Sequence, residues 1–257
     1  MNGYSLLLGV GAALGLMQIV QRVPEMQSLR WVIAGLGLLA AGLAGARASY
    51  VWLFPTYYQA TPQAAWQITQ GGLAWPGALI GGMAAMFIAA LLLRAPLGLA
   101  ADVFAPLFIY VAITAWLGAA FSGIAYGIEV YQGSLWALPS YQPDGFLVYR
   151  WPLQLTAALT LFYIIWRFDR RSEDWRIPGS RAGASGLLLA GHTALFSSWR
   201  DDGGLIFNSL RVDYAAAGLL AGLCLLGLLA CLMLRIRASL SNEAPGANRE
   251  TWFSPRE

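Results

Sequence analysis

Long apolar segments with very few charges are the feature that most limits what this chain can fold into. Only 11% of its 257 residues are charged, whereas 58% are hydrophobic. Soluble domains carry about a quarter charged residues, so this composition indicates that lipid is the solvent. A chain that crosses lipid must satisfy its backbone hydrogen bonds internally, as helices and closed barrels do. Because the apolar runs are unbroken rather than alternating, they favour helices.

Seven apolar segments are long enough to cross a bilayer core of about 30 Å, for which about 17 residues are the lower limit. They cover residues 4–20, 31–53, 76–93, 105–127, 151–167, 183–199 and 213–235. The sequence therefore predicts an all-α polytopic membrane protein. Its seven-helix domain is expected over residues 1–238, and a polar cytoplasmic tail is expected over residues 239–257.

The arginines predict how this domain is oriented, since cytoplasmic loops of membrane proteins carry an excess of positive charge. All sixteen basic residues are arginine. An N-terminus outside the cell and a cytoplasmic C-terminus place twelve of them on the cytoplasmic side. The four arginines that this orientation leaves outside are Arg47, Arg150, Arg200 and Arg211.

Four short segments between or at the ends of the predicted spans stand out from the low-complexity background. They are GGLAWPGALIGG (71–82), FSGIAYGIEVY (121–131), RWPLQLTAA (150–158) and LFSSWRDDG (195–203). Glycines in such segments let the backbone approach a ligand or a neighbouring helix closely. For the third segment a purely structural interpretation is also open, in which Pro152 begins a helix and Arg150 extends outward to the interface.

Together these segments resemble the prolipoprotein diacylglyceryl transferases, bacterial membrane enzymes that transfer the diacylglyceryl group of phosphatidylglycerol to a cysteine thiol and release glycerol phosphate. The resemblance implies a multi-pass protein of the bacterial plasma (inner) membrane with a bound phospholipid, which contacts matching residues. Those matching, potentially lipid-binding residues are Gly71, Gly72, Gly77, Gly81, Gly123, Glu129, Tyr131, Arg150, Gln154 and Arg200.

The chain departs from the family pattern at the residues that handle charge. Pro76 stands where the family has a histidine, and Phe121 stands where it has an arginine taken to engage the lipid phosphate. Ile124 and Gly127 occupy the positions of two asparagines. Proline cannot transfer a proton, and phenylalanine cannot hold a phosphate as a forked cation does. The residues that shape helices are thus retained, and those that would carry chemistry are replaced.

These departures leave two main hypotheses open. In the first, the chain is a catalytically degenerate relative that keeps a phospholipid-binding cavity and serves as an accessory subunit of a larger membrane complex. In the second, it is an active transferase that uses Arg150, Arg200 and His192 in a rearranged site. A third hypothesis, a transporter or channel, has less support because few polar groups lie inside the predicted spans.

The sequence also supports expectations about His192 and Asp102, and it lacks motifs for a metal, a cofactor or nucleic acid. His192, the single histidine, lies in the sixth predicted span and is either a functional group or a neutral, hydrogen-bonded residue of the bundle. Asp102 is interpreted as the start of the helix of the fourth span. The sequence shows no metal-ligand spacing and no cofactor motif, and its basic residues do not form the exposed stripe typical of nucleic-acid binding.

Overall fold

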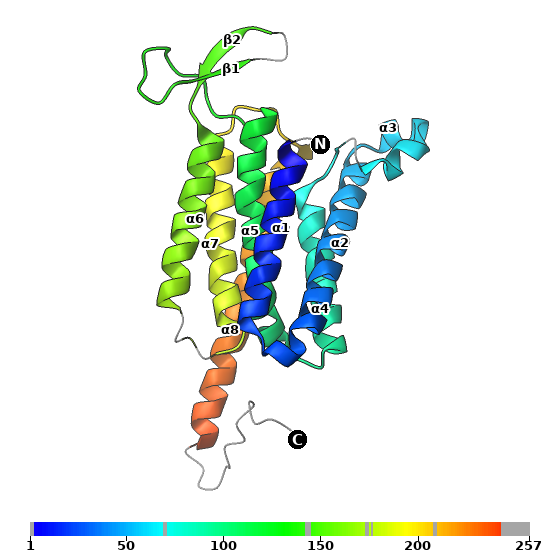
Figure 1. Cartoon of the computed structure of the whole chain (residues 1–257), viewed down its shortest axis with the longest axis vertical. Helices are drawn as coiled ribbons and strands as arrows, with labels where there is room; N and C mark the ends of the chain where they lie inside the picture. Colours follow the sequence, from blue (N-terminus) through cyan, green and yellow to red (C-terminus); the bar gives the residue numbers. More distant parts are fainter. Residues whose placement is uncertain are drawn as a thin grey trace.

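Seven long helices run along one common axis and form a bundle (Figure 1). The structure is a computed structural model, and it describes residues 3–68, 71–141, 145–172, 175, 177–207 and 210–242. The long helices are α1 Gly3–Arg22, α2 Ser28–Leu53, α4 Trp75–Leu92, α5 Leu97–Ser122, α6 Leu153–Arg171, α7 Ser180–Ser198 and α8 Val212–Asn242. The short helical segments are η1 Glu25–Gln27, α3 Pro55–Ala60 and η2 Pro62–Trp66.

Each of the seven predicted spans coincides with one long helix, which confirms the all-α polytopic membrane fold. Five stretches of the described chain are long and apolar enough to cross a membrane: α1, η1 together with α2, α4, α5 and α8 as far as Arg237. The remaining two helices, α6 and α7, are 19 residues long each. The N-terminus of α1 and the end of α8 lie at opposite ends of the bundle (Figure 1). The end where α1 begins, which the arginines predict to face outward, is called the outer end below.

The structure differs from the sequence-based expectation in the bounds of one helix and in the segments at the outer end. The fourth helix was expected over residues 105–127, but α5 begins at Leu97 and ends at Ser122. It stops there because Gly123, with a φ of +64°, adopts the left-handed conformation that ends many helices. Two antiparallel hairpins, which the sequence analysis missed, also lie at the outer end: β1 Leu138–Tyr141 with β2 Leu147–Arg150, and β3 Ile206–Phe207 with β4 Leu210–Arg211.

Asp102 does not begin a helix, contrary to the interpretation of the sequence, because it lies in the second turn of α5. Its carboxylate instead accepts hydrogen bonds from the backbone N–H groups of Gly179 and Ala182, both at 2.7 Å. These N–H groups belong to the start of α7, where the first turn lacks intrahelical partners. Asp102 therefore caps a different helix from the one on which it lies. The end of α8 at Asn242 also passes the predicted boundary at residue 238, and residues 243–257 of the predicted tail lie outside the described residues.

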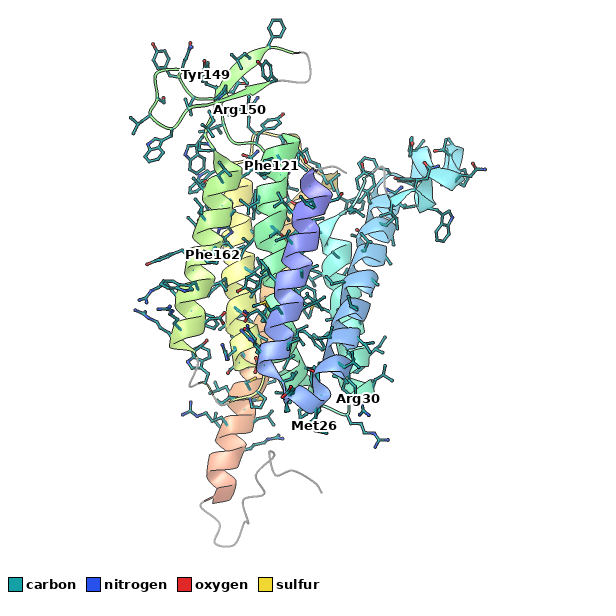
Figure 2. All side chains as sticks on the ribbon, viewed as in Figure 1. Met26, Arg30, Phe121, Tyr149, Arg150 and Phe162 are labelled. Atoms are coloured by element: carbon teal, nitrogen blue, oxygen red, sulfur yellow. The ribbon has the colours of Figure 1, made fainter. Side chains whose placement is uncertain are left out.

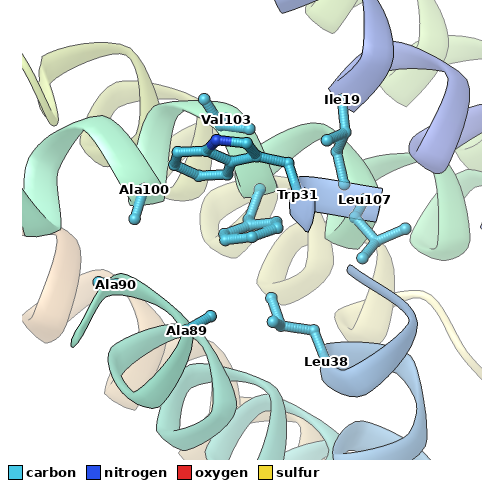
Figure 3. Close-up of a cluster of buried hydrophobic side chains, with 9 residues drawn as sticks. Ile19, Trp31, Leu38, Ala89, Ala90, Ala100, Val103 and Leu107 are labelled. Atoms are coloured by element: carbon cyan, nitrogen blue, oxygen red, sulfur yellow. The ribbon is translucent and has the colours of Figure 1, made fainter. Parts of the chain in front are cut away.

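The core lies between the helices and consists of aliphatic and aromatic side chains. In one cluster, Trp31 of α2 packs with its ring 5.4 Å from that of Phe104 on α5, and Ile19 of α1 is fully buried beside them (Figure 3). A second cluster joins α5, α6, α7 and α8 around Leu161 and Leu189. Many other large apolar side chains are exposed on the outside of the bundle, as is expected of a surface that faces lipid.

Small residues bring the backbones of α2 and α4 close together. A Cβ atom at Gly77 would lie only 2.0 Å from the carbonyl oxygen of Gly45, and one at Gly81 would lie 2.3 Å from that of Ala41. Such close approach is how helices gain packing energy in lipid, where no hydrophobic effect drives them together. Gly77 and Gly81 therefore hold α4 against α2, which fixes the position of the segment that precedes α4.

Candidate functional site

Three segments that are far apart in the sequence meet at the outer end of the bundle. Residues 126–130 lie between residues 149–151 on one side and residues 200–201 on the other. The backbone of Val130 donates a hydrogen bond to Tyr149 at 2.8 Å, and that of Asp201 donates one to Tyr126 at 3.0 Å. Antiparallel bridges also pair Glu129 with Arg150 and residue 127 with residue 200. The fold thereby brings together side chains from three of the four sequence segments singled out above.

Arg150 lies at the base of the β1–β2 hairpin, and its guanidinium group is buried (Figure 2). It donates to Glu129 Oε1 and to Asp201 Oδ2, at 2.9 Å each, and to the carbonyl oxygen of Gly127 at 3.1 Å. Its charged carbon atom also lies 4.0 Å from the centre of the Tyr126 ring, a favourable cation–π distance. Arg150 thus holds the three segments together by its own contacts.

Arg200 makes a second, adjacent set of ion pairs. It forms a two-pronged contact with Asp202, at 2.8 and 2.5 Å, and a hydrogen bond of 2.7 Å with Asp213. Arg211 lies 3.4 Å from Asp202 and 3.6 Å from Asp213. Burial lowers the pKa of the Arg200 guanidinium, but its hydrogen bonds with Asp202 and the charges of both aspartates outweigh that effect and raise the pKa overall. Arg200 is therefore a permanent cation bound to two carboxylates.

Asp213 connects this second set to the glycine-rich segment before α4. It lies in the first turn of α8, where the helix dipole stabilises a negative charge. Its other carboxylate oxygen accepts a hydrogen bond of 3.0 Å from the indole N–H of Trp75, the residue just before Pro76. The remaining sequence segment, residues 71–82, is thereby joined to the same region.

These side chains form one group, called the outer cluster below: Arg150, Arg200, Arg211, Glu129, Asp201, Asp202 and Asp213. Three guanidinium groups face four carboxylates, so with all of them ionised the cluster carries one net negative charge. Oppositely charged partners within about 4 Å neutralise each other's field toward a third ion. The outer cluster is consequently a poor place for a phosphate. Among the described residues, no group of histidine, cysteine and acidic side chains could hold a metal ion.

The remaining predicted lipid-binding residues are distributed over other places. Gln154, buried in the first turn of α6, donates to the carbonyl oxygen of Ile124. Gly77 and Gly81 lie in the interface of α2 and α4, and Gly123 ends α5. Tyr131 is 83% exposed in the loop before β1. Gly71 and Gly72 lie beside Arg47, which is not a member of the outer cluster, and both accept hydrogen bonds from its Nη1 atom.

Neither the two residues that replace the family's histidine and arginine nor the single histidine is placed to handle a proton or a phosphate. Pro76 lies in the first turn of α4, where it lacks an N–H. Phe121 is 76% exposed near the end of α5 (Figure 2). His192 is buried between helices, where its Nε2 lies 3.0 Å from the hydroxyl of Thr160 and its ring stacks 4.3 Å from that of Phe196. The contacts of His192 are those of a residue packed inside the bundle.

Four members or neighbours of the outer cluster were not predicted from the sequence: Asp202, Asp213, Arg211 and Trp75. One signal was available for Asp213, since an ionisable residue at the start of a span is a candidate functional group. The pairing itself was not visible, because 138 residues separate Trp75 from Asp213.

The fold and the site define a class, a helical multi-pass membrane protein whose outer end carries a compact network of ion pairs. Comparison with known proteins gives the family. The family model of the prolipoprotein diacylglyceryl transferases matches residues 1–235, so the chain belongs to that family. Members of the family are proteins of the bacterial inner membrane, and the membrane-spanning helices of this chain agree with that location.

A curated relative is the phosphatidylglycerol–prolipoprotein diacylglyceryl transferase of Cupriavidus metallidurans strain CH34. The two sequences are 28% identical over 191 residues, which are 67% of this chain. The matched part spans 64% of the length of the relative.

Proposed function

We propose that this protein is a catalytically degenerate member of its family that retains phospholipid binding and acts as an accessory subunit of a membrane protein complex. The observation that supports this most directly is the charge of the outer cluster. Arg150 and Arg200, the arginines that match the family pattern, each bind two carboxylates of the same chain.

The chemistry of a diacylglyceryl transfer explains why this observation matters. In that reaction a thiol loses its proton, its sulfur forms a bond to a glycerol carbon, and the carbon–oxygen bond to the phosphate breaks. The reaction needs a group that accepts the proton and a cation that stabilises the leaving phosphate. Removing one such stabilising group typically costs a factor of about 10² to 10³ in rate. Here Pro76 and Phe121 supply neither function, and the nearby arginines are already bound to acidic side chains.

An apolar surface at the outer end supports the role of an accessory subunit. The loop before β1 and the β1–β2 hairpin project beyond the helices (Figure 1). Five large side chains in these segments are 66–90% exposed: Tyr131, Leu135, Trp136, Tyr141 and Phe146. Exposed apolar patches of this kind mark sites of protein–protein or membrane contact. Affinity purification from the native membrane tests this role, and a protein that always purifies without companions would contradict it.

A second candidate function is an active transferase with a rearranged site. One contact favours it: Trp75, next to Pro76, is hydrogen-bonded to Asp213, which in turn binds Arg200. Two cationic groups, those of Arg200 and Arg211, therefore do lie near the position of the family's histidine.

A mass measurement decides between the two candidates. The purified protein is incubated with phosphatidylglycerol and a peptide that carries the cysteine of a prolipoprotein signal sequence. We expect no gain of a diacylglyceryl mass on the peptide, while an active family member in a parallel reaction shows the gain. A gain that is abolished by Arg150→Ala would establish the second candidate and refute catalytic degeneracy.

A further inference from the structure

A cavity separate from the outer cluster lies beside the outer end of α2. Its volume is about 340 Å³, and it is an open cavity bordered by α2, α3, η2 and the segment that leads into α4. Its lining residues are Arg47, Tyr50, Phe54, Tyr57, Tyr58, Ala64, Gly71 and Gly72. Ligand sites in proteins have volumes of about 300 to 1,000 Å³, so this cavity suits a small group such as a lipid headgroup rather than a whole lipid.

The cavity contains a buried cation whose recorded polar partners are all neutral. Arg47 is 7% exposed, and its guanidinium group donates to the backbone carbonyl oxygens of Ala64, Ala65, Gly71 and Gly72. Among the described residues, no carboxylate lies within ion-pair distance of it. Carbonyl groups orient the side chain but leave its positive charge uncompensated. A guanidinium group has five N–H bonds, and the four recorded bonds leave one N–H of Nη2 for a ligand.

The backbone at Gly71 and Gly72 is shaped to surround this guanidinium group. Both residues have positive φ angles, +86° and +71°, which glycine adopts without strain. Their carbonyl oxygens lie 2.5 and 3.0 Å from Arg47 Nη1. A Cβ atom at residue 72 would lie 2.6 Å from the same nitrogen and would displace it. The two glycines therefore contribute to the site by holding Arg47 in place.

Aromatic rings form the walls beside this cation. The Tyr58 ring centre lies 5.4 Å from the charged carbon of Arg47, and the Tyr57 ring packs edge-on against it at 4.9 Å. Tyr50 and Phe54 form a second ring pair at 4.7 Å. Tyrosine joins an apolar ring to a hydroxyl group, which suits the boundary between lipid chains and headgroups. The cavity thus combines one unneutralised cation with amphipathic walls at the end of a membrane-spanning helix.

We infer that this cavity holds the phosphate-bearing headgroup of an anionic phospholipid of the outer leaflet. The inference rests on the retained phospholipid binding proposed above and specifies where in the structure the lipid headgroup binds. The outer cluster has an excess of carboxylates, which repel a phosphate, whereas Arg47 has no acidic partner in the described part of the chain. Charge-assisted hydrogen bonds to a phosphate are about twice as strong as neutral ones, so Arg47 provides the headgroup specificity and the rings contact its glycerol portion.

Native mass spectrometry of the full chain in detergent tests this inference. The protein is equilibrated with phosphatidylglycerol and phosphatidylcholine of equal chain length, and the lipid that stays bound is counted. We expect the wild type to retain phosphatidylglycerol preferentially. Tyr57→Ala and Arg47→Gln should each weaken that retention about tenfold, the effect of losing one good charged or ring contact. Tyr163→Ala, which removes a tyrosine of α6 that is 59% exposed and lies outside the cavity, is the matched control and should leave retention unchanged.

The outcomes separate the failure of this inference from that of the proposed function. No retention of either lipid by the wild type would refute retained phospholipid binding itself. Equal retention by wild type, Tyr57→Ala and Arg47→Gln would show that lipid binds elsewhere and would refute only the Arg47 cavity. If Arg47→Gln fails to fold, Tyr57→Ala decides alone, because Tyr57 is 56% exposed. Displacement of phosphatidylglycerol by millimolar glycerol phosphate would show that the cavity takes a free phosphate ester and would overturn its assignment to lipid.

Discussion

Replacing Arg150 by glutamine tests whether the outer cluster is a structural connection between three segments. The substitution keeps some polarity but removes the charge that Glu129 and Asp201 share. The arginine side chain is 8% exposed, while the two carboxylate side chains are 50% and 49% exposed. Since the carboxylates can regain water, the cost falls below the 3–5 kcal/mol of breaking a fully buried pair.

The magnitude follows from the individual contacts of Arg150. Two ion pairs to half-exposed acids contribute about 0.5–1 kcal/mol each. The contact with the Tyr126 ring contributes about 1 kcal/mol. We therefore expect Arg150→Gln to lower the free energy of unfolding by about 2–3 kcal/mol.

Reversible unfolding by sodium dodecyl sulfate in mixed micelles, followed by tryptophan fluorescence, measures this change. Arg30→Gln is the matched control, because Arg30 is exposed at the opposite end of the bundle, and it should change stability by less than about 0.5 kcal/mol. In a double-mutant cycle with Asp201→Asn, the coupling energy should be about 0.5–1 kcal/mol. Equal effects of the two arginine substitutions, or zero coupling, would refute the structural role of Arg150.

Three further substitutions are measured by the same unfolding assay. Gly77→Ala should prevent α4 from packing on α2 and cost at least about 2 kcal/mol, whereas Gly37→Ala, with open space around it, should be close to neutral; equal effects would contradict the close packing. Asp102→Ala should cost about 1–2 kcal/mol by removing the cap of α7, and wild-type stability would contradict that role. Thr160→Val should cost about 0.6 kcal/mol by removing the hydrogen bond to His192, and a stabilised variant would show that this bond is not formed.

The helices were predictable from the sequence because each contains a local apolar run, and in five stretches of the described chain that run is long and apolar enough to cross a membrane. The glycines at 77 and 81 were recognised as residues that permit close approach, but the sequence did not distinguish approach to a ligand from approach to a helix. In the structure the neighbour is α2 at both positions. The β1–β2 hairpin was not predicted, since Leu138–Tyr141 contains a proline and shows no clear alternation.

The ion pairs were not predictable because they join residues that are distant in the sequence. Arg150 meets Glu129 and Asp201 only because residues 126–130 lie between two other segments. The role of Asp102 was misread for the same reason, as its partners at the start of α7 lie 77 and 80 residues away. Local patterns identify which residues can be charged, and the tertiary fold decides which charges remain unneutralised.

This distinction changes what a matching arginine means for function. Arg150 and Arg200 fit the family pattern by position, but each already binds two carboxylates. These carboxylates provide the negative charge that a bound phosphate would otherwise provide. Arg47 belongs to none of the segments that carried the resemblance. Among the described residues, it is the one buried arginine whose partners are only backbone carbonyl oxygens and an aromatic ring. A site for an anion therefore follows from the count of opposing charges around each cation. By that measure the cavity beside α2 fits a phosphate better than the outer cluster does, which is why the inference above assigns the lipid headgroup to Arg47.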